Sequence, residues 1–240
     1  MDRLDGTVVV VTGAARGIGL ATATLLTERG ATVVGLDLDR PERDIGFAGF
    51  HLVDLRDDAA VEAFFDDVVA THGRIDGLVN NAVLVTVGPF LDSSLADLDR
   101  AYAVNIRALF HAAQQAARRM GEGGSIVNLA SVNGERGVRN TSVYSLTKGA
   151  VAALTRTMAV ELTERGIRCN AVAPSPTGTD KVLALLSAAD IETRTRRIPL
   201  GRLATPPEIA QAIAFLVSPA SSFVTGHVLP ADGGYLAYGS

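Results

Sequence analysis

The chain has 240 residues, of which 48% are hydrophobic and 20% are charged. These proportions are typical of a globular protein and exclude a disordered or collagen-like chain. The formal net charge of −4 argues against a general attraction to nucleic acid or to anionic lipid. Because one core suffices for a chain of this length, we expect a single domain over residues 1–240.

Cysteine and histidine usage excludes several kinds of site. Cys169 has no second thiol for an internal disulfide or a Cys-rich zinc site, so we expect a small buried hydrophobe there. The four histidines show no paired metal-ligand spacing, so we expect no metal, and no Gly-x-Ser-x-Gly hydrolase elbow is present. The first apolar run, residues 8–11, is too short for a signal peptide or membrane span, which predicts a cytoplasmic protein.

Short β-branched runs alternate with longer segments of helical period. The predicted strands are residues 7–12, 32–37, 49–53, 78–81, 125–130, 167–173 and 227–231. The predicted helices are residues 17–29, 57–71, 95–120, 142–164 and 207–216. Because the strands are nearly all apolar, we expect helices on both faces of the sheet. The pattern predicts an α/β fold with a doubly wound parallel sheet of about seven strands.

Glycines mark the ends of the predicted helices. Gly30, Gly73, Gly121 and Gly166 stand where a helix needs a left-handed stop. The one long stretch without a regular pattern, residues 174–202, follows the sixth predicted strand. Its length predicts a functional lid.

A glycine-rich turn joins the first predicted strand to the first predicted helix. Residues 12–19 read Thr-Gly-Ala-Ala-Arg-Gly-Ile-Gly. Gly13, Gly17 and Gly19 allow a tight turn and a close backbone approach to a pyrophosphate, and the helix N-terminus favours negative charge. This position predicts a dinucleotide site, although a simple strand-to-helix corner has the same pattern.

Acidic residues end the next two predicted strands. Asp37 stands where a carboxylate would meet the ribose hydroxyls and repel a 2′-phosphate, which favours NAD over NADP. The alternative is that Asp37 and Asp39 are turn residues, and Arg16 and Arg40 keep NADP open. Asp54 ends the third strand, where it either accepts a hydrogen bond from the adenine amino group or caps a turn.

A second constellation follows the fifth predicted strand, which Ser131 ends. Tyr144 and Lys148 are four residues apart and therefore lie on one face of a helix. A nearby ammonium stabilises phenolate and moves the pKa of the tyrosine toward neutrality, where it can exchange a proton with an alcohol or a carbonyl. Ser131 would hold the substrate oxygen.

Together these residues resemble the classical short-chain dehydrogenase/reductase family over essentially the whole chain. The resemblance is carried by the glycine motif 12–19, Asp54, Asn80-Asn81-Ala82, Asn105, Ser131, Tyr144, Lys148, Pro174, Thr179 and Asp232-Gly233-Gly234. It implies a Rossmann-like sheet with a nicotinamide dinucleotide bound across the carboxyl ends of its strands.

The resemblance also implies a catalytic tetrad. Tyr144 would be the acid/base, Ser131 the oxygen binder, and Lys148 would lower the pKa of Tyr144 and hold the nicotinamide ribose. Asn105 would fix a water that links Lys148 to solvent; without the resemblance it is simply a polar helix residue. The implied cofactor residues are Gly13, Arg16, Gly17, Ile18, Gly19, Asp37, Leu38, Asp54, Leu55, Asn81, Ala82, Tyr144, Lys148, Pro174, Thr177 and Thr179. The implied substrate residues are Ser131, Asn133, Tyr144 and Ser175.

Two residues depart from the family pattern. Val83 and Ser175 replace glycines of the usual Asn-Asn-Ala-Gly and Pro-Gly sequences. Each adds a side chain where the cofactor or a sharp backbone turn is expected. Weakened cofactor binding is therefore one hypothesis.

Substrate and assembly are indicated only indirectly. Arg194, Arg196 and Arg197 cluster in the expected lid, either to recognise an acidic group or as a solvated face. The polar turn 133–140 hints at a polar substrate. Small residues in helix 95–120 and after Tyr144 permit close packing, and the resemblance implies a homotetramer that uses these helices, with residues 235–240 near another interface.

The leading prediction is an NAD-dependent enzyme that interconverts a secondary alcohol and its ketone, with a small-molecule substrate and no nucleic-acid or membrane partner. The first alternative is an NADPH-dependent 3-oxoacyl reductase, which the arginines favour and Asp37 opposes. The second alternative is a non-catalytic nucleotide-binding regulator, which Val83 and Ser175 motivate.

Overall fold

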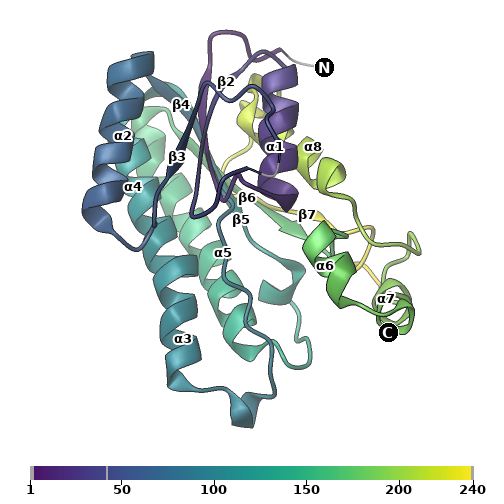
Figure 1. The fold of residues 1–240 in the computed structure, drawn as a ribbon. Helices are drawn as coiled ribbons and strands as arrows, with labels where there is room; N and C mark the ends of the chain where they lie inside the picture. Colours follow the sequence, from purple (N-terminus) through teal and green to yellow (C-terminus); the bar gives the residue numbers. More distant parts are fainter. Residues whose placement is uncertain (1–2, 42, 239–240) are drawn as a thin grey trace.

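The computed structural model describes residues 3–41 and 43–238, and these form one α/β unit around a parallel sheet (Figure 1). The sheet has seven strands in the order β3-β2-β1-β4-β5-β6-β7. The strands are β1 Val8–Thr12, β2 Thr32–Asp37, β3 Gly49–Leu52, β4 Ile75–Asn80, β5 Met120–Leu129, β6 Arg168–Pro174 and β7 Val228–Ala231. This arrangement confirms the predicted doubly wound parallel sheet.

The central strand β1 explains why the sheet is covered on both faces. Its four consecutive valines and Thr12 are all buried, and β-branched side chains suit a pleated strand. Val10 aligns with Val34 of β2 on one side and with Leu78 of β4 on the other. The strand order reverses between β1 and β4, and such a switch point leaves a crevice at the carboxyl ends of the strands.

Helices form a layer on each side of the sheet (Figure 1). One layer contains α1 Gly17–Glu28 and α8 Pro206–Val217, which pack on one apolar core with Val9 and Val11. The other contains α2 Asp58–His72, α4 Leu109–Arg119 and α5 Ser142–Leu162, which pack on a second core. Short helical turns are η1 Phe90–Asp92, η3 Val132–Gly134, η4 Thr163–Arg165 and η5 Pro219–Ser221.

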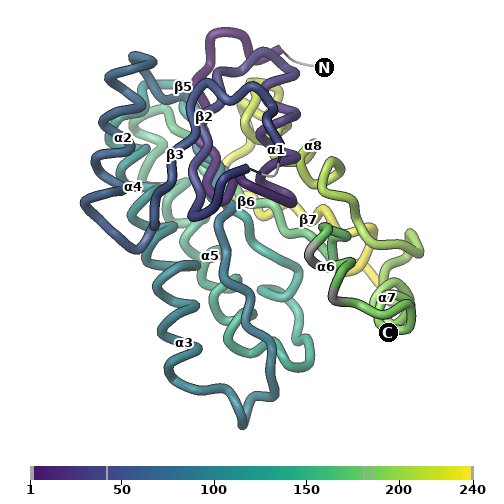
Figure 2. The backbone as a smooth tube through the Cα atoms, in the orientation of Figure 1, coloured from purple at the N-terminus to yellow at the C-terminus, as the bar shows by residue number. Residues whose placement is uncertain are grey.

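The helix predicted over residues 95–120 is interrupted. It consists of α3 Leu95–Tyr102, a π-helical turn η2 Ala103–Ala108, and α4, and α3 extends beyond the sheet (Figure 2). A π-helical turn inserts a residue without changing the hydrophobic period enough to be visible in sequence. The prediction for Gly121 was also wrong, since this residue lies in β5 and not in a left-handed stop, whereas Gly30, Gly73 and Gly166 have positive φ as expected.

The lid was wrongly predicted to be irregular, because two short helices form within it. These are α6 Asp180–Leu185 and α7 Ala188–Thr195 (Figure 2). Thr179 caps α6, and Ser187 forms a capping box with Asp190 at the start of α7. The Ser-x-x-Asp spacing at 187–190 is the sequence signal that would have revealed α7.

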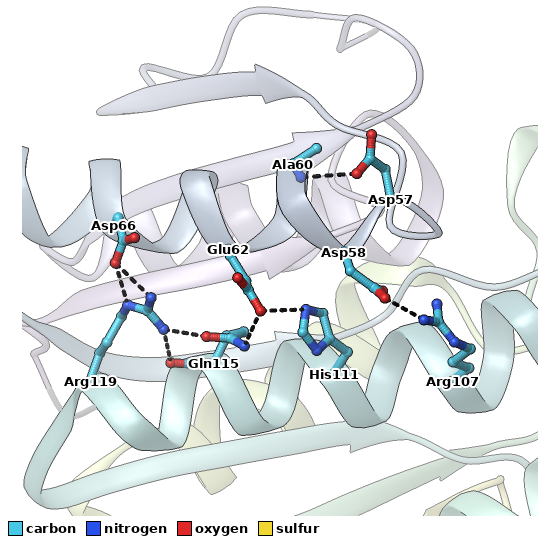
Figure 3. A network of polar contacts seen from close by, with 9 residues as sticks. All are labelled: Asp57, Asp58, Ala60, Glu62, Asp66, Arg107, His111, Gln115 and Arg119. Atoms are coloured by element: carbon cyan, nitrogen blue, oxygen red, sulfur yellow. Dashed lines mark hydrogen bonds and ion pairs between the residues drawn. The ribbon is translucent and has the colours of Figure 1, made fainter.

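A row of polar contacts joins α2 to η2 and α4 (Figure 3). Arg107 in η2 pairs with Asp58, and Arg119 at the end of α4 pairs with Asp66 at 2.6 Å. Between them, the Gln115 amide donates to Glu62 at 3.2 Å. Exposed pairs contribute about 0.2–1 kcal/mol each, so the row adds little to the stability of the fold.

The predicted burial of Cys169 is confirmed. The thiol lies in the sheet, 3.7 Å from the Asn128 amide, and burial raises its pKa to about 12. Across the described ranges, no group of three His, Cys, Asp or Glu residues is arranged to hold a metal ion. Nor does any helix there have the length and apolar character needed to cross a membrane.

We predict that Gly19→Ala destabilises the protein by about 1–3 kcal/mol, because overpacking against backbone cannot be relieved by a rotamer change. A Cβ at Gly19 would stand 2.0 Å from the Gly13 carbonyl oxygen and 2.5 Å from the Asn81 amide. The loss in the free energy of unfolding is measured by urea denaturation, with circular dichroism as the signal. The matched control is Gly121→Ala, where nothing lies within 4 Å. Equal stabilities for the two variants would refute the proposed crowding.

Candidate functional site

The glycine-rich turn is locked to the end of β4. The Asn81 side-chain amide donates to the carbonyl oxygens of Thr12 at 3.0 Å and Gly13 at 2.9 Å. In return, the Thr12 hydroxyl accepts hydrogen bonds from the backbone N–H groups of Asn81 and Ala82, each at 3.0 Å. Four hydrogen bonds therefore join β1 and β4 at the switch point of the sheet.

The turn leaves the N-terminus of α1 open toward the crevice. Gly13 and Gly17 have φ values of 64° and 56°, which L side chains rarely adopt. Arg16 precedes α1, and its side chain makes no capping hydrogen bond to the helix. Ile18, in the first turn of α1, packs against the core. The first N–H groups of α1 therefore have no side-chain cap from Arg16, and uncapped N–H groups at a helix N-terminus after a glycine-rich turn, the glycine cradle, fit a pyrophosphate.

Asp37 lies against this turn. Its carboxylate accepts hydrogen bonds from the Ala15 N–H at 3.0 Å and the Leu38 N–H at 2.7 Å. Leu38 is exposed beside it. Arg16 is paired with Asp39, a contact that the sequence did not reveal because the two residues come from different loops. The structure therefore brings Asp37 to the cradle and commits Arg16 to another carboxylate.

Asp54 lies beyond the end of β3. It accepts a hydrogen bond from the Arg56 N–H at 2.9 Å and pairs with the guanidinium of the same residue at 2.6 Å. The Arg56 guanidinium holds the pKa of Asp54 below its usual value. Asp57 caps α2 with a 3.1 Å bond from Ala60, and Leu55 packs on the core. Asp54 therefore shapes the turn before α2 without capping the helix.

Ser131 and Tyr144 meet at the carboxyl end of β5. Ser131 follows β5 and accepts a hydrogen bond from the Asn133 N–H at 3.2 Å. Burial raises the pKa of Tyr144, and a hydrogen bond with the Ser131 hydroxyl lowers it in part. The phenol is therefore protonated at neutral pH in this structure, which differs from the expectation that a cation lowers its pKa.

Lys148 explains this difference. Its side chain is buried, and its ammonium donates to the Leu129 carbonyl oxygen, a contact that the sequence did not predict. The ammonium lies 5.7 Å from the centre of the Tyr144 ring. Burial lowers the pKa of Lys148 to about 8. The two residues share one face of α5 as predicted, but the structure directs the charge of Lys148 to the end of β5.

Asn105 lies in η2 and joins three elements. Its amide donates to the Leu84 carbonyl oxygen at 2.9 Å and to the Thr147 hydroxyl at 3.1 Å, and its carbonyl oxygen accepts from the Leu84 N–H at 2.8 Å. Thr147 immediately precedes Lys148. Asn105 is thus more than a polar helix residue, because it ties the loop after β4 to the helix that carries Tyr144 and Lys148.

The segment after β6 returns to the glycine-rich turn. Pro174 ends β6, and Thr177 donates to the Ser175 carbonyl oxygen at 3.0 Å. Thr179 caps α6 and lies beside Gly17, since a Cβ on that glycine would stand 3.3 Å from its methyl group. The structure therefore gathers residues of the lid and of the first turn at one edge of the sheet.

The two departures from the family pattern cause no backbone strain. Among the described residues, Asn140 is the one non-glycine position with φ in the left-handed region, so Val83 and Ser175 have ordinary backbones. Val83 is 43% exposed. Ser175 is buried, and its hydroxyl makes no hydrogen bond within the described part of the chain.

The arginine cluster of the lid lies at the surface. Arg194, Arg196 and Arg197 are exposed, and Arg196 pairs with Glu192 at 2.6 Å on α7. This geometry favours the solvated face over recognition of an acidic group. Arg136 was missed in the sequence: it donates to the Tyr235 carbonyl oxygen at 3.2 Å and lies over that ring, which fastens the C-terminal segment beside Ser131.

Comparisons with known proteins identify the family of the chain. The family model described as enoyl-(acyl carrier protein) reductase matches residues 13–236. A cis-4-hydroxycyclohexanecarboxylate dehydrogenase of Sinomonas cyclohexanicum is 43% identical over 96% of each chain. A 3-oxoacyl-(acyl-carrier-protein) reductase of Thermotoga maritima is 38% identical and covers 97% of this chain and 98% of its own.

A solved structure extends the likeness to the whole fold. The ligand-free aldohexose dehydrogenase of Thermoplasma acidophilum superposes with a TM-score of 0.91 at 31% identity, covering 98% of this chain and 96% of its own. The family model and these relatives extend over nearly the whole described chain. The protein therefore belongs to the short-chain dehydrogenase/reductase family of oxidoreductases.

Proposed function

We propose that this protein is an NAD-dependent dehydrogenase that interconverts a small secondary alcohol and its ketone. The observation that carries the proposal is the half-buried Tyr144 phenol, hydrogen-bonded to Ser131 and one helical turn from the Lys148 ammonium. This trio lies at the same edge of the sheet as the glycine cradle. An acid/base group and a dinucleotide site at one edge are what hydride transfer to a carbonyl requires.

The residues of the chain divide the chemistry between them. Ser131 holds the substrate oxygen, and the raised pKa of Tyr144 keeps the phenol protonated, so that it donates its proton to that oxygen during reduction. During oxidation the same phenol, once deprotonated, accepts the hydroxyl proton. The Lys148 ammonium, held by the Leu129 carbonyl oxygen, lies 5.7 Å from the centre of the Tyr144 ring, and Asn105 orients the turn of α5 that precedes Lys148. A bound nicotinamide supplies or accepts the hydride.

NAD is the proposed cofactor. Gly13, Gly17 and Gly19 would hold its pyrophosphate, and Asp37 its adenosine ribose. Two backbone N–H groups orient the Asp37 carboxylate, which would repel the 2′-phosphate of NADP. The guanidinium that could compensate, Arg16, is paired with Asp39.

The substrate is proposed to be a cyclic or sugar-like alcohol. This follows from the relatives' printed activities toward a hydroxycyclohexanecarboxylate and an aldohexose. The 3-oxoacyl reductase activity of another relative makes an NADPH-dependent reductase the second candidate. The position of Asp37 at the glycine-rich turn and the pairing of Arg16 with Asp39 weigh against that second candidate.

Replacement of the acid/base separates an enzyme from a nucleotide-binding regulator. Tyr144→Phe should lower kcat by about 10²–10⁴-fold with a secondary alcohol, because it removes proton transfer and leaves the cradle intact. NADH should bind with unchanged affinity. The control is Tyr102→Phe, at an exposed tyrosine of α3. Full turnover by Tyr144→Phe would refute the mechanism.

A paired titration tests the cofactor. We expect NADH to bind at least about tenfold more tightly than NADPH, since one desolvated charge repulsion exceeds 1.4 kcal/mol. The emission of the reduced nicotinamide is the signal, because the chain has no tryptophan. Asp37→Asn should reduce the preference for NADH over NADPH. The control Asp92→Asn, at an exposed residue of η1, should leave this preference unchanged. Tighter NADPH binding by the unaltered protein would support the reductase instead.

A homotetramer is the proposed assembly, with α4 and α5 in one interface. Tyr102, Phe110 and Val160 support it, since these large apolar side chains are exposed on α3, α4 and α5. Light scattering should give four times the 25.0 kDa chain mass. A monomer mass would contradict the proposal.

A further inference from the structure

The loop that leads from Ser131 into α5 contains a residue with an unusual backbone. Asn140 has a φ of 64°, a left-handed value that residues with a side chain adopt rarely and that asparagine tolerates better than most. Its side chain is exposed, whereas its carbonyl oxygen accepts a hydrogen bond from the Gly88 N–H at 2.8 Å. Backbones of this kind persist where the surrounding structure enforces them, and they are concentrated at functional sites.

The hydrogen bond joins two segments that are distant in the chain. Gly88 belongs to the segment that follows β4, and Asn140 directly precedes Thr141, the residue at the N-cap of α5. Gly88 and Thr141 also form a parallel β-bridge. Both segments lie beyond the sheet (Figure 2). We call this hydrogen bond and this bridge together the Gly88–Asn140 clasp.

The start of α5 has no side-chain cap of its own. The Thr141 side chain makes no capping hydrogen bond to the helix, because its hydroxyl donates to the Val138 carbonyl oxygen at 2.9 Å. The Ser142 hydroxyl, in the first turn, has no partner within the described ranges. An uncapped first turn leaves backbone N–H groups unsatisfied and is less stable than a capped one. The clasp therefore supplies a backbone contact at the point where α5 begins.

Tyr144 lies in this first turn, and the next turn is held by other contacts. Thr147 accepts a hydrogen bond from the Asn105 amide at 3.1 Å, and Lys148 donates to the Leu129 carbonyl oxygen. Neither contact fixes the residues at the beginning of the helix. A misplacement of about 1 Å in a reacting group can lower a rate by about 100-fold. The position of the Tyr144 phenol on Ser131 therefore depends on what holds the first turn.

We propose that Asn140 is a positioning residue, whose left-handed backbone fastens the start of α5 to Gly88 and thereby holds the Tyr144 phenol on Ser131 for proton transfer. This inference rests on the proposed function, which gives Tyr144 the proton transfer. The role belongs to the backbone of residue 140. Glycine should therefore replace asparagine there, and a β-branched residue should not.

The first test compares Asn140→Val with Asn140→Gly. The assay is oxidation by NAD of cyclohexanol or of cis-4-hydroxycyclohexanecarboxylate, whichever the unaltered protein oxidises faster. Asn140→Val should lower kcat by about 10–100-fold, because it disfavours positive φ and displaces the phenol. Asn140→Gly should keep kcat within about twofold, since glycine adopts positive φ readily. The dissociation constant of NADH should not change in either variant, because the glycine cradle belongs to other segments.

The pH profile of kcat separates positioning from a loss of folded protein. The hydrogen bond with Ser131 lowers the pKa of Tyr144 in part, so a displaced phenol should have a higher pKa. The apparent pKa for oxidation should therefore rise in Asn140→Val and stay in place in Asn140→Gly. Loss of folded protein would instead scale kcat equally at every pH. Lys148, the cation beside the phenol, is held in the second turn and should contribute equally in both variants.

A second pair of variants tests the other half of the clasp and leaves residue 140 unchanged. Gly88→Pro removes the N–H donor, and Gly88→Ala keeps it. A Cβ at Gly88 would have nothing within 4 Å, so Gly88→Ala is a matched control. Gly88→Pro should show the loss of kcat and the higher apparent pKa, and Gly88→Ala should behave as the unaltered protein. This pair decides the question if Asn140→Val does not fold.

Three outcomes would reject the role of Asn140 and leave the proposed function standing. They are full kcat in Asn140→Val or in Gly88→Pro, an equal loss in Asn140→Val and Asn140→Gly, which would assign the effect to the side chain, and a loss of kcat without a rise in the apparent pKa. Failure of the unaltered protein to oxidise either alcohol with NAD would reject the proposed function together with this role.

Discussion

The site depends on a tight junction between the carboxyl ends of β1 and β4. The Asn81 amide and the Thr12 hydroxyl close four hydrogen bonds across this junction, and Gly19 packs so tightly that no side chain fits beside the Gly13 carbonyl. A clash with backbone atoms cannot be relieved by a change of side-chain rotamer. The junction therefore fixes the position of the start of α1. The other side chains of the site lie at the same edge of the sheet as this N-terminus of α1.

Burial determines the protonation of the groups that follow β5. The hydrophobic layer under α5 removes water from Tyr144 and Lys148, which raises the pKa of the phenol and lowers that of the ammonium. Desolvation therefore opposes charge on both residues, and the Leu129 carbonyl compensates the ammonium with a hydrogen bond. Asn105 adds rigidity, since the π-helical turn directs its amide between the loop after β4 and α5.

The lid lies at the end of this edge that β6 and β7 form, and its contacts with the rest of the protein are weaker. The lid consists of two short capped helices, and it is fastened through Ile198, which packs with Val132 and Tyr235, and through the Leu200 N–H, which donates to the Gly233 carbonyl oxygen at 3.2 Å. Positive φ at Gly233 lets the backbone pass close to Ile198.

Hydrophobic period and residue spacing are local properties, and they were enough to predict the parallel sheet, its two helical layers, and the glycine, serine, tyrosine and lysine positions. The π-helical turn at Asn105, the pairing of Arg16 with Asp39, and the contact of Lys148 with Leu129 became visible in the folded chain alone. The same is true of the direction in which the pKa of Tyr144 is shifted. These features depend on burial and on contacts between segments distant in the chain, and neither is encoded in the spacing of neighbouring residues.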